Sequence, residues 1–136
     1  MQTEKVTAET FTRLLCARSD LESMREKLAR TRAGLTRITQ RYEATGVRGG
    51  QYDAMAAHQA ALEELEAEYA QRKLQHLRDL AAVIAGCAGL DGLMSEVIWD
   101  RYVDGRSVEA IAAARHYSDG YIKNLIFKGR CRLMEN

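Results

Sequence analysis

The sequence contains no proline, so no residue of that kind interrupts a helix anywhere in its 136 residues. It also lacks runs of alternating β-branched residues that would indicate a sheet, whereas Ala, Leu, Glu and Arg are plentiful. These features predict an all-α protein. The length fits one domain, or a small domain joined to a helical extension, and the composition favours the second arrangement.

Cysteines are few and far apart, at Cys16, Cys87 and Cys131, and none belongs to a CxxC pair. This spacing supports neither a disulfide framework nor a zinc site, so we expect no metal, no cofactor and a reducing cytoplasm as the compartment. Polar residues follow Met1, and no apolar run approaches the length that spans a bilayer. We therefore expect neither export nor a membrane anchor.

Residues typical of catalysis are also sparse. His58, His76 and His116 are widely separated, no HExxH motif is present, and no Cys or Ser stands beside a recognisable base. His58 and His76 lie about five helical turns apart, too far to bind one metal ion within a single helix. The sequence thus predicts a protein that is not an enzyme.

Heptad spacing dominates the N-terminal half. From Thr7, one series falls at seven-residue steps, and a second series follows each of its first four members by three residues. Such a pattern predicts a coiled-coil helix. The first series is Leu14, Leu21, Leu28, Leu35 and Tyr42, and the second is Ala17, Met24, Thr31 and Ile38.

A second long helix is expected from about Tyr52 to Ala85. Its first half keeps the seven-based spacing, at Met55, Leu62, Leu65 and Tyr69. Beyond Tyr69 the apolar residues are Leu74, Leu77, Leu80, Val83 and Ile84. This change predicts a register shift of about one residue, as at a stutter, which rotates the apolar face toward a C-terminal domain.

Two glycine clusters divide the chain. The first, Gly46 to Gly50, lacks the preceding strand and the following Lys-Ser/Thr of a phosphate loop, so it predicts a helix-hairpin loop near residues 45–51. The second, Gly86 to Gly92, predicts the boundary between a coiled-coil hairpin (1–88) and a small domain (89–136). An acidic run at Glu63 to Glu68 would face basic Arg25 to Arg41 in the hairpin, but these charges could equally select a second copy, as a homodimer.

After the second cluster, a short helix is expected from Leu93 to Val103, with Trp99 as a core anchor. Because so small a domain is near the lower limit for folding alone, we expect Leu80 to Ile84 to contribute to its core. The pattern from Arg106 to Lys128 then predicts two helices joined by a tight turn. Ser107 is expected to cap the first helix and Ser118 the second. The inward stripe of the second helix is Ile122, Leu125, Ile126 and Leu133, with Tyr117 also expected in the core. This stripe leaves Asp119, Gly120, Lys123, Asn124 and Phe127 nearer solvent.

This stretch resembles the helix-turn-helix of region 4 of bacterial sigma factors. The resemblance rests on Arg101-Tyr102, Gly105, Ser107, Ile111-Ala112, Tyr117-Ser118, Ile122-Lys123 and Leu133. Together with the helical N-terminal half, the chain is similar to small phage-encoded transcriptional regulators in which a coiled coil precedes a sigma-like region. The chain differs from the family at three positions. Arg115 stands where the family usually has a buried Leu, and His116 stands where a Gly takes the left-handed turn conformation. Gly129 replaces a commoner Ala.

The second helix of the motif, from about Asp119, is expected to enter a DNA major groove. Asn124 can form a bidentate bond to adenine, Lys123 can reach guanine or phosphate, and Gly120 allows close approach. Asp119 either accepts a hydrogen bond from the amino group of a cytosine or only complements the positive end of the helix dipole. The candidate DNA-binding residues are Arg106, Ser107, Arg115, Ser118, Asp119, Gly120, Tyr121, Lys123, Asn124, Lys128 and Arg130.

The expected function is that of a sequence-specific DNA-binding transcriptional regulator. The resemblance implies control of a phage operon in the host cytoplasm, with host RNA polymerase as a further expected contact. Two alternatives stay open: an adaptor that contacts RNA polymerase through the sigma-like domain, and a small-terminase-like subunit that packages phage DNA as a ring. Whether the chain is a monomer or a homodimer is also open at this point.

Overall fold

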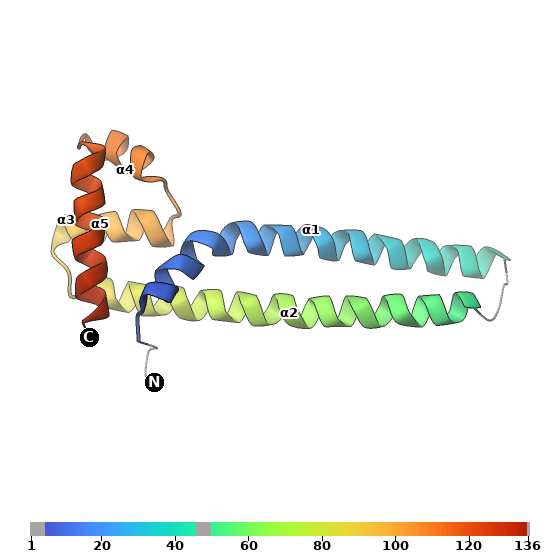
Figure 1. Cartoon of the computed structure of the whole chain (residues 1–136). Helices are drawn as coiled ribbons and strands as arrows, with labels where there is room; N and C mark the ends of the chain where they lie inside the picture. The colour runs from blue at the N-terminus through green and yellow to red at the C-terminus, as the bar shows by residue number, and fades with distance from the viewer. Residues whose placement is uncertain (1–4, 46–49, 136) are drawn as a thin grey trace. The chain divides into compact units, whose positions relative to one another are not determined.

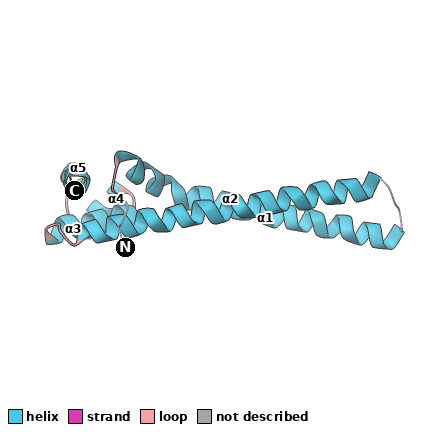
Figure 2. Cartoon of the chain, turned by 90° about the horizontal axis from the view of Figure 1, so that it is seen from below, coloured by secondary structure: helices cyan, strands magenta, loops and turns pink. Residues whose placement is uncertain are grey.

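The computed structural model of the chain describes residues 5–45 and 50–135. Its elements are α1 (Ala8–Thr45), α2 (Gly50–Cys87), α3 (Gly92–Ile98), the π-helix η1 (Trp99–Val103), α4 (Val108–Arg115) and α5 (Asp119–Met134). Figure 2 shows only helices and loops in this part of the chain. The predicted all-α class with a long N-terminal helical hairpin is therefore confirmed. The predicted glycine-rich loop falls on residues 46–49, outside the described residues.

The chain divides into two compact units. We call residues 19–73 the arm unit, and residues 1–18 with 74–136 the terminal unit. The arm unit contains the middle of the hairpin, and the terminal unit joins the start of α1 and the end of α2 to the C-terminal helices. The boundary between a domain of residues 1–88 and a domain of residues 89–136 stays a prediction.

Within the arm unit, α1 and α2 run antiparallel (Figure 1). The predicted heptad positions of α1 therefore pack against α2 of the same chain. Leu28 of α1 and Leu62 of α2 are buried. His58 Nε2 lies 3.0 Å from the carbonyl oxygen of Thr31, at the edge of the same seam. The apolar face of α1 in this unit is thus covered by α2 of the same chain.

The predicted register shift in α2 is wrong. Leu77, which the shift would bury, is 55% exposed, and Leu74 and Ile84 are also exposed. Of the predicted series, Val83 is buried and Leu80 is partly buried, and His76 and Asp79 lie inward with them. His76 and Val83 follow Tyr69 at seven-residue steps, so the spacing of the seam continues. The shift was inferred from apolar residues alone, whereas two polar residues occupy the inward positions.

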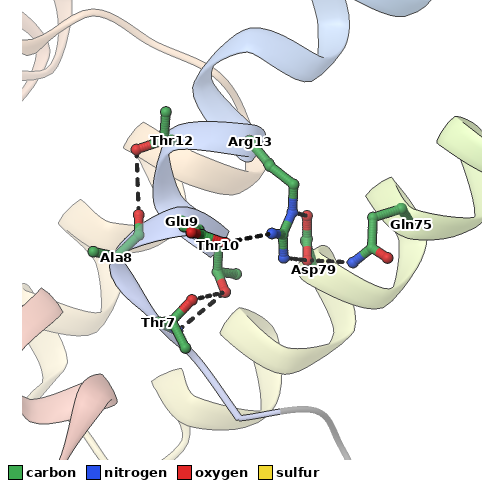
Figure 3. A network of polar contacts seen from close by, with 8 residues as sticks. All are labelled: Thr7, Ala8, Glu9, Thr10, Thr12, Arg13, Gln75 and Asp79. Atoms are coloured by element: carbon green, nitrogen blue, oxygen red, sulfur yellow. Dashed lines mark hydrogen bonds and ion pairs between the residues drawn. The ribbon is translucent and has the colours of Figure 1, made fainter.

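Asp79 can take an inward position because Arg13 of α1 neutralises it, as Figure 3 shows. The guanidinium makes a two-pronged contact, with Nε 2.9 Å from Oδ2 and Nη2 2.8 Å from Oδ1. Gln75 donates a third hydrogen bond to the carboxylate at 3.0 Å. A buried carboxylate with this many donors is satisfied in the core.

The core of the terminal unit draws on every helix of that unit. Its buried apolar residues include Phe11 and Leu14 of α1, Ala82 and Val83 of α2, and residues of α3, α4 and α5. The predicted contribution of Leu80 to Ile84 is confirmed for Ala82 and Val83, with Leu80 packed at the edge, while Ile84 is exposed.

Trp99, predicted as a core anchor, is 38% exposed. Val97, Ile98 and Tyr102 already fill the inward stripe of α3 and η1, so the next residue after Ile98 turns away from it. The backbone of η1 also widens here, because the amide of Asp104 bonds to the carbonyl of Trp99, five residues back. Among the described helices, none is long and apolar enough to cross a membrane.

Candidate nucleic-acid interface

The two C-terminal helices α4 and α5 are joined by a three-residue turn, His116 to Ser118. Both predicted caps are confirmed: Ser107 Oγ accepts from the Ala110 amide at 3.1 Å, and Ser118 Oγ accepts from the Tyr121 amide at 3.2 Å. Such caps satisfy amides that a helix start leaves unpaired. They fix where each helix begins, and so which residues lead α5.

His116 takes the left-handed conformation, with φ of 61°. This is the place where the resemblance expects glycine, and a residue with a Cβ loses roughly 1 to 2 kcal/mol in that conformation. The turn nevertheless closes, because the Tyr117 amide bonds to the carbonyl of Ala112 at 3.0 Å. The departure at His116 therefore leaves the helix, turn and helix in place.

Arg115 at the end of α4 is held by two carboxylates. Its Nε lies 2.7 Å from Asp100 Oδ2, and its Nη1 lies 2.7 Å from Glu96 Oε2. The hydrogen bond to Asp100, aided by both negative charges, raises the pKa of Arg115 above its ordinary value. Asp100 is buried, so Arg115 supplies the charge that this carboxylate needs. As a candidate phosphate contact, Arg115 has its charge already offset.

Tyr117 was predicted in the core, and this is wrong: it is 43% exposed. Ile111, Ala112 and Ile122 are the buried residues of α4 and of the start of α5. The Tyr117 ring instead lies against that of Tyr121, with centroids 4.9 Å apart. Tyr121, whose role the sequence left undecided, is thus half of an exposed aromatic pair.

The inward face of α5 consists of Ile122, Ile126, Gly129 and Leu133, all buried. At 100° per residue, Asn124 lies at the centre of the opposite face, Gly120 lies about 30° from it, and Phe127 and Lys128 lie about 50° to either side. Lys123 borders this face next to Phe127, and Tyr121 borders it next to Lys128. All of these side chains are exposed. We call these six residues the outer face of α5.

Gly129 explains how closely α5 approaches α3. A Cβ at this position would lie 2.7 Å from Ile98 Cγ1 and 2.8 Å from Ile98 Cδ1, closer than carbon atoms pack. The glycine that replaces the commoner alanine of the sigma-like pattern therefore matches Ile98 beneath it. The inward face of α5 is fixed by this contact, and the outer face with it.

The positive charge of the motif is smaller than the sequence suggests. Of the basic residues from Arg115 to Arg132, Arg115 is paired as described, and Arg132 Nη1 lies 3.6 Å from Asp91 Oδ2. Arg130 is partly buried, with its guanidinium 5.0 Å from the centre of the Phe11 ring. Within the described residues, Lys123 and Lys128 have no ion-pair partner. They supply the available charge of α5.

The remaining candidates lie at the ends of the helices. Arg106 and Ser107 are exposed just before α4, and Asp119 is the first residue of α5, where a carboxylate complements the positive helix end. The structure thus gathers Gly120, Tyr121, Lys123, Asn124 and Lys128 on one face and engages Arg115 and Arg130 elsewhere. Phe127 was missing from the predicted set, although its position three residues after Asn124 already placed it on this face.

Comparisons of the chain with protein-family models, with curated proteins and with solved structures give no match. Over the ranges that the structure describes, no group of three or more His, Cys, Asp or Glu side chains could hold a metal ion. A shallow pocket of about 200 Å³ lies beside Arg115, lined by Ser95, Glu96, Trp99 and Asp100. The outer face of α5 is the candidate nucleic-acid interface of this chain.

Proposed function

We propose that the chain is a sequence-specific DNA-binding transcriptional regulator that inserts α5, from about Asp119, into the major groove. The observation that supports this most is the outer face of α5, on a helix whose start is fixed by Ser118. This face presents an amide and two lysines that have no ion-pair partner among the described residues. The first turns of such a helix are the part that contacts base edges.

Each side chain has a role that its position permits. Asn124 forms the bidentate bond to adenine N6 and N7, and Lys123 contacts guanine or a nearby phosphate. Arg106, Ser107 and Lys128 contact phosphates, which orient the protein without distinguishing sequences. Gly120 faces open space, because a Cβ there would meet nothing within 4 Å. Since it has no side chain, its backbone can approach the groove. The resemblance to phage regulators adds a phage operon, in the host cytoplasm, as the target.

The test combines Lys123→Ala with Asn124→Ala. Both side chains are exposed, so we expect the midpoint of thermal unfolding to stay unchanged. One good bidentate contact distinguishes bases by about 1 to 3 kcal/mol, so affinity for the preferred site is expected to fall roughly ten- to hundredfold. The preferred site comes from retention of fragmented phage and host DNA at physiological salt, followed by sequencing.

A matched control is Lys27→Ala with Gln40→Ala, which removes one exposed lysine and one exposed amide from α1. This control is expected to retain the affinity of the parent chain. Equal affinity of the parent and the Lys123/Asn124 variant for every DNA would contradict the proposal. Salt must be held fixed, because phosphate contacts alone give unspecific binding that weakens as salt rises.

A second candidate function is an adaptor that binds host RNA polymerase. The observation that favours it is the exposed indole of Trp99, at a pocket with Glu96, since exposed aromatic residues are enriched at protein interfaces. Absence of retained DNA, together with binding to purified RNA polymerase that Trp99→Ala abolishes, would favour the adaptor.

Oligomeric state separates the remaining alternatives. In this structure of one chain, α1 and α2 occupy the seam of the arm unit. A homodimer through the coiled coil would pair these helices between two chains instead. Light scattering of the full chain distinguishes a monomer, a dimer and the ring expected of a small-terminase-like packaging subunit. A dimer would also predict two DNA half-sites related by twofold symmetry.

A further inference from the structure

Phe127 is the most exposed large apolar side chain of the described residues, at 66%. It lies on the outer face of α5, about one turn after Asn124 and about two turns after Gly120. Single exposed apolar residues are common on protein surfaces and by themselves indicate nothing. What distinguishes Phe127 is its place between Lys123 and Lys128, on the face whose chemistry suits DNA.

We propose that Phe127 contacts the methyl group of a thymine, so that the preferred site of this chain contains an A·T pair at the position beneath Phe127. This inference rests on the proposed function. In the major groove, the C5-methyl group of thymine is the one apolar group that a base edge presents, and phenyl rings are among its partners. An apolar ring on this face has no hydrogen bond to offer to the other bases.

The spacing along α5 fits this assignment. Asn124 and Phe127 are three residues apart, which is about 4.5 Å along a helix axis. Successive base pairs of DNA are about 3.4 Å apart, so the two side chains reach neighbouring base pairs. Asn124 would then bond to an adenine while Phe127 covers a thymine methyl group at the next step. The combined expectation is a short run of A·T pairs at the centre of each recognised half-site.

The charges around Phe127 favour DNA over a protein or a membrane as the occupant of this face. Lys123 and Lys128 flank it without ion-pair partners among the described residues. The rest of the face is polar apart from Tyr121, whose ring is already in contact with Tyr117. One apolar ring between two cations matches a groove with phosphates along its rims.

The experiment replaces thymine by uracil, which removes the methyl group and leaves base pairing intact. Duplexes of the preferred site carry this replacement at one position at a time, and affinity is measured with the full chain. Removing the burial of one methyl group should weaken binding about fourfold, at one or two positions only. Phe127→Ala should bind the thymine and uracil duplexes equally at those positions.

Two variants serve as controls. Phe127→Leu keeps an apolar group and is expected to retain part of the discrimination against uracil. Leu77→Ala removes an exposed apolar side chain from α2 and should discriminate as the parent chain does. Because Phe127 is mostly exposed, its variants should unfold at the same temperature as the parent, which circular dichroism checks.

The outcomes separate this inference from the function on which it rests. Specific binding without any difference between thymine and uracil would overturn the inference and leave the regulator intact. Discrimination that persists in Phe127→Ala would overturn it as well, since another group would then contact the methyl. Absence of specific binding to any DNA would overturn both.

Discussion

Gly129 is the residue at which α5 and α3 meet most closely, and it gives a prediction about stability. Gly129→Ala places a Cβ within 2.8 Å of two Ile98 carbons. Overpacking of a core costs about 1 to 3 kcal/mol, whereas alanine in a helix interior gains about 1 kcal/mol over glycine. We expect the free energy of unfolding to fall by about 1 kcal/mol, measured by urea denaturation.

Gly120→Ala is the matched control in the same helix. A Cβ at Gly120 would meet nothing within 4 Å, so the substitution should leave stability unchanged or raise it by up to about 1 kcal/mol. If both alanine variants were equally stable, the contact between Gly129 and Ile98 would not limit the approach of α5.

His76 predicts how stability depends on pH. Burial lowers its pKa below the ordinary value of about 6.5, the charge of Arg18 lowers it further, and Asp79 opposes both. The unfolded chain therefore binds a proton at higher pH than the folded chain. Stability from this group is complete well above pH 6.5, decreases as pH falls through that value, and levels off below the folded pKa.

The measurement compares the parent chain with His76→Leu by urea denaturation at about pH 7.5 and about pH 5.5. We expect the parent to lose more stability between the two conditions than the variant does. His76 Nδ1 is buried and has no hydrogen-bond partner in the residues that the structure describes, so leucine suits the position. An identical loss in both proteins would contradict the assignment.

The contact between Arg13 of α1 and Asp79 of α2 predicts how strongly the pairing of these two helices contributes to the free energy of unfolding. Asp79 is 2% exposed, and Arg13→Ala would leave Gln75 as the hydrogen-bond donor to its carboxylate among the described residues. Removing one partner of a buried pair typically costs 3 to 5 kcal/mol, and we expect about 3 kcal/mol because the Arg13 side chain is 41% exposed. Thermal and urea denaturation measure this loss.

The double variant Arg13→Leu with Asp79→Leu tests the physical reason. Replacing a buried ion pair by apolar residues is often neutral or stabilising, so the double variant should be more stable than Arg13→Ala. A double variant as unstable as the single one would indicate that the hydrogen bonds of Asp79, rather than its unpaired charge, determine the cost.

The same contact shows where sequence patterns reach their limit. The seam at Leu28 and the caps at Ser107 and Ser118 follow from spacing and residue type, and these were predicted. Asp79 and His76 interrupt the apolar pattern, and the partner that makes Asp79 acceptable lies 66 residues away in the sequence. Periodicity along one helix contains no information on such a partner, so the register of α2 was predicted wrongly.

The candidate site could likewise be predicted only in part from the sequence. The outer face of α5 follows from its apolar stripe, because a helix has a fixed period. Counting charges did not reveal that Asp100 engages Arg115 or that Arg130 lies over Phe11, since both contacts depend on tertiary packing. The exposed Tyr117 was missed for the same reason.

The core of the terminal unit includes residues of α1 and α2 as well as residues of the C-terminal helices. Phe11, Leu14 and Val83 are buried with Ile98, Ile111 and Ile122. A fragment of residues 89–136 would expose the apolar surface that these partners cover. We expect this fragment to show no cooperative thermal unfolding by circular dichroism, whereas the full chain does.

A cooperative transition in the fragment would instead support an independent domain from residue 89. The full chain is in either case the form in which DNA binding should be measured, because α5 packs on α3 and on the residues that this fragment lacks.

Because the core of the terminal unit combines α1 with the C-terminal helices, it cannot be completed early in synthesis. A ribosome releases the residues of the arm unit, 19–73, while most of the terminal unit has yet to be made. Phe11 emerges before the arm unit, yet Tyr102 and Arg130, whose side chains lie against its ring, emerge after that unit. Until those residues are made, Phe11 lacks these neighbours. Helix α1 is thus made early but is among the last to reach its final packing.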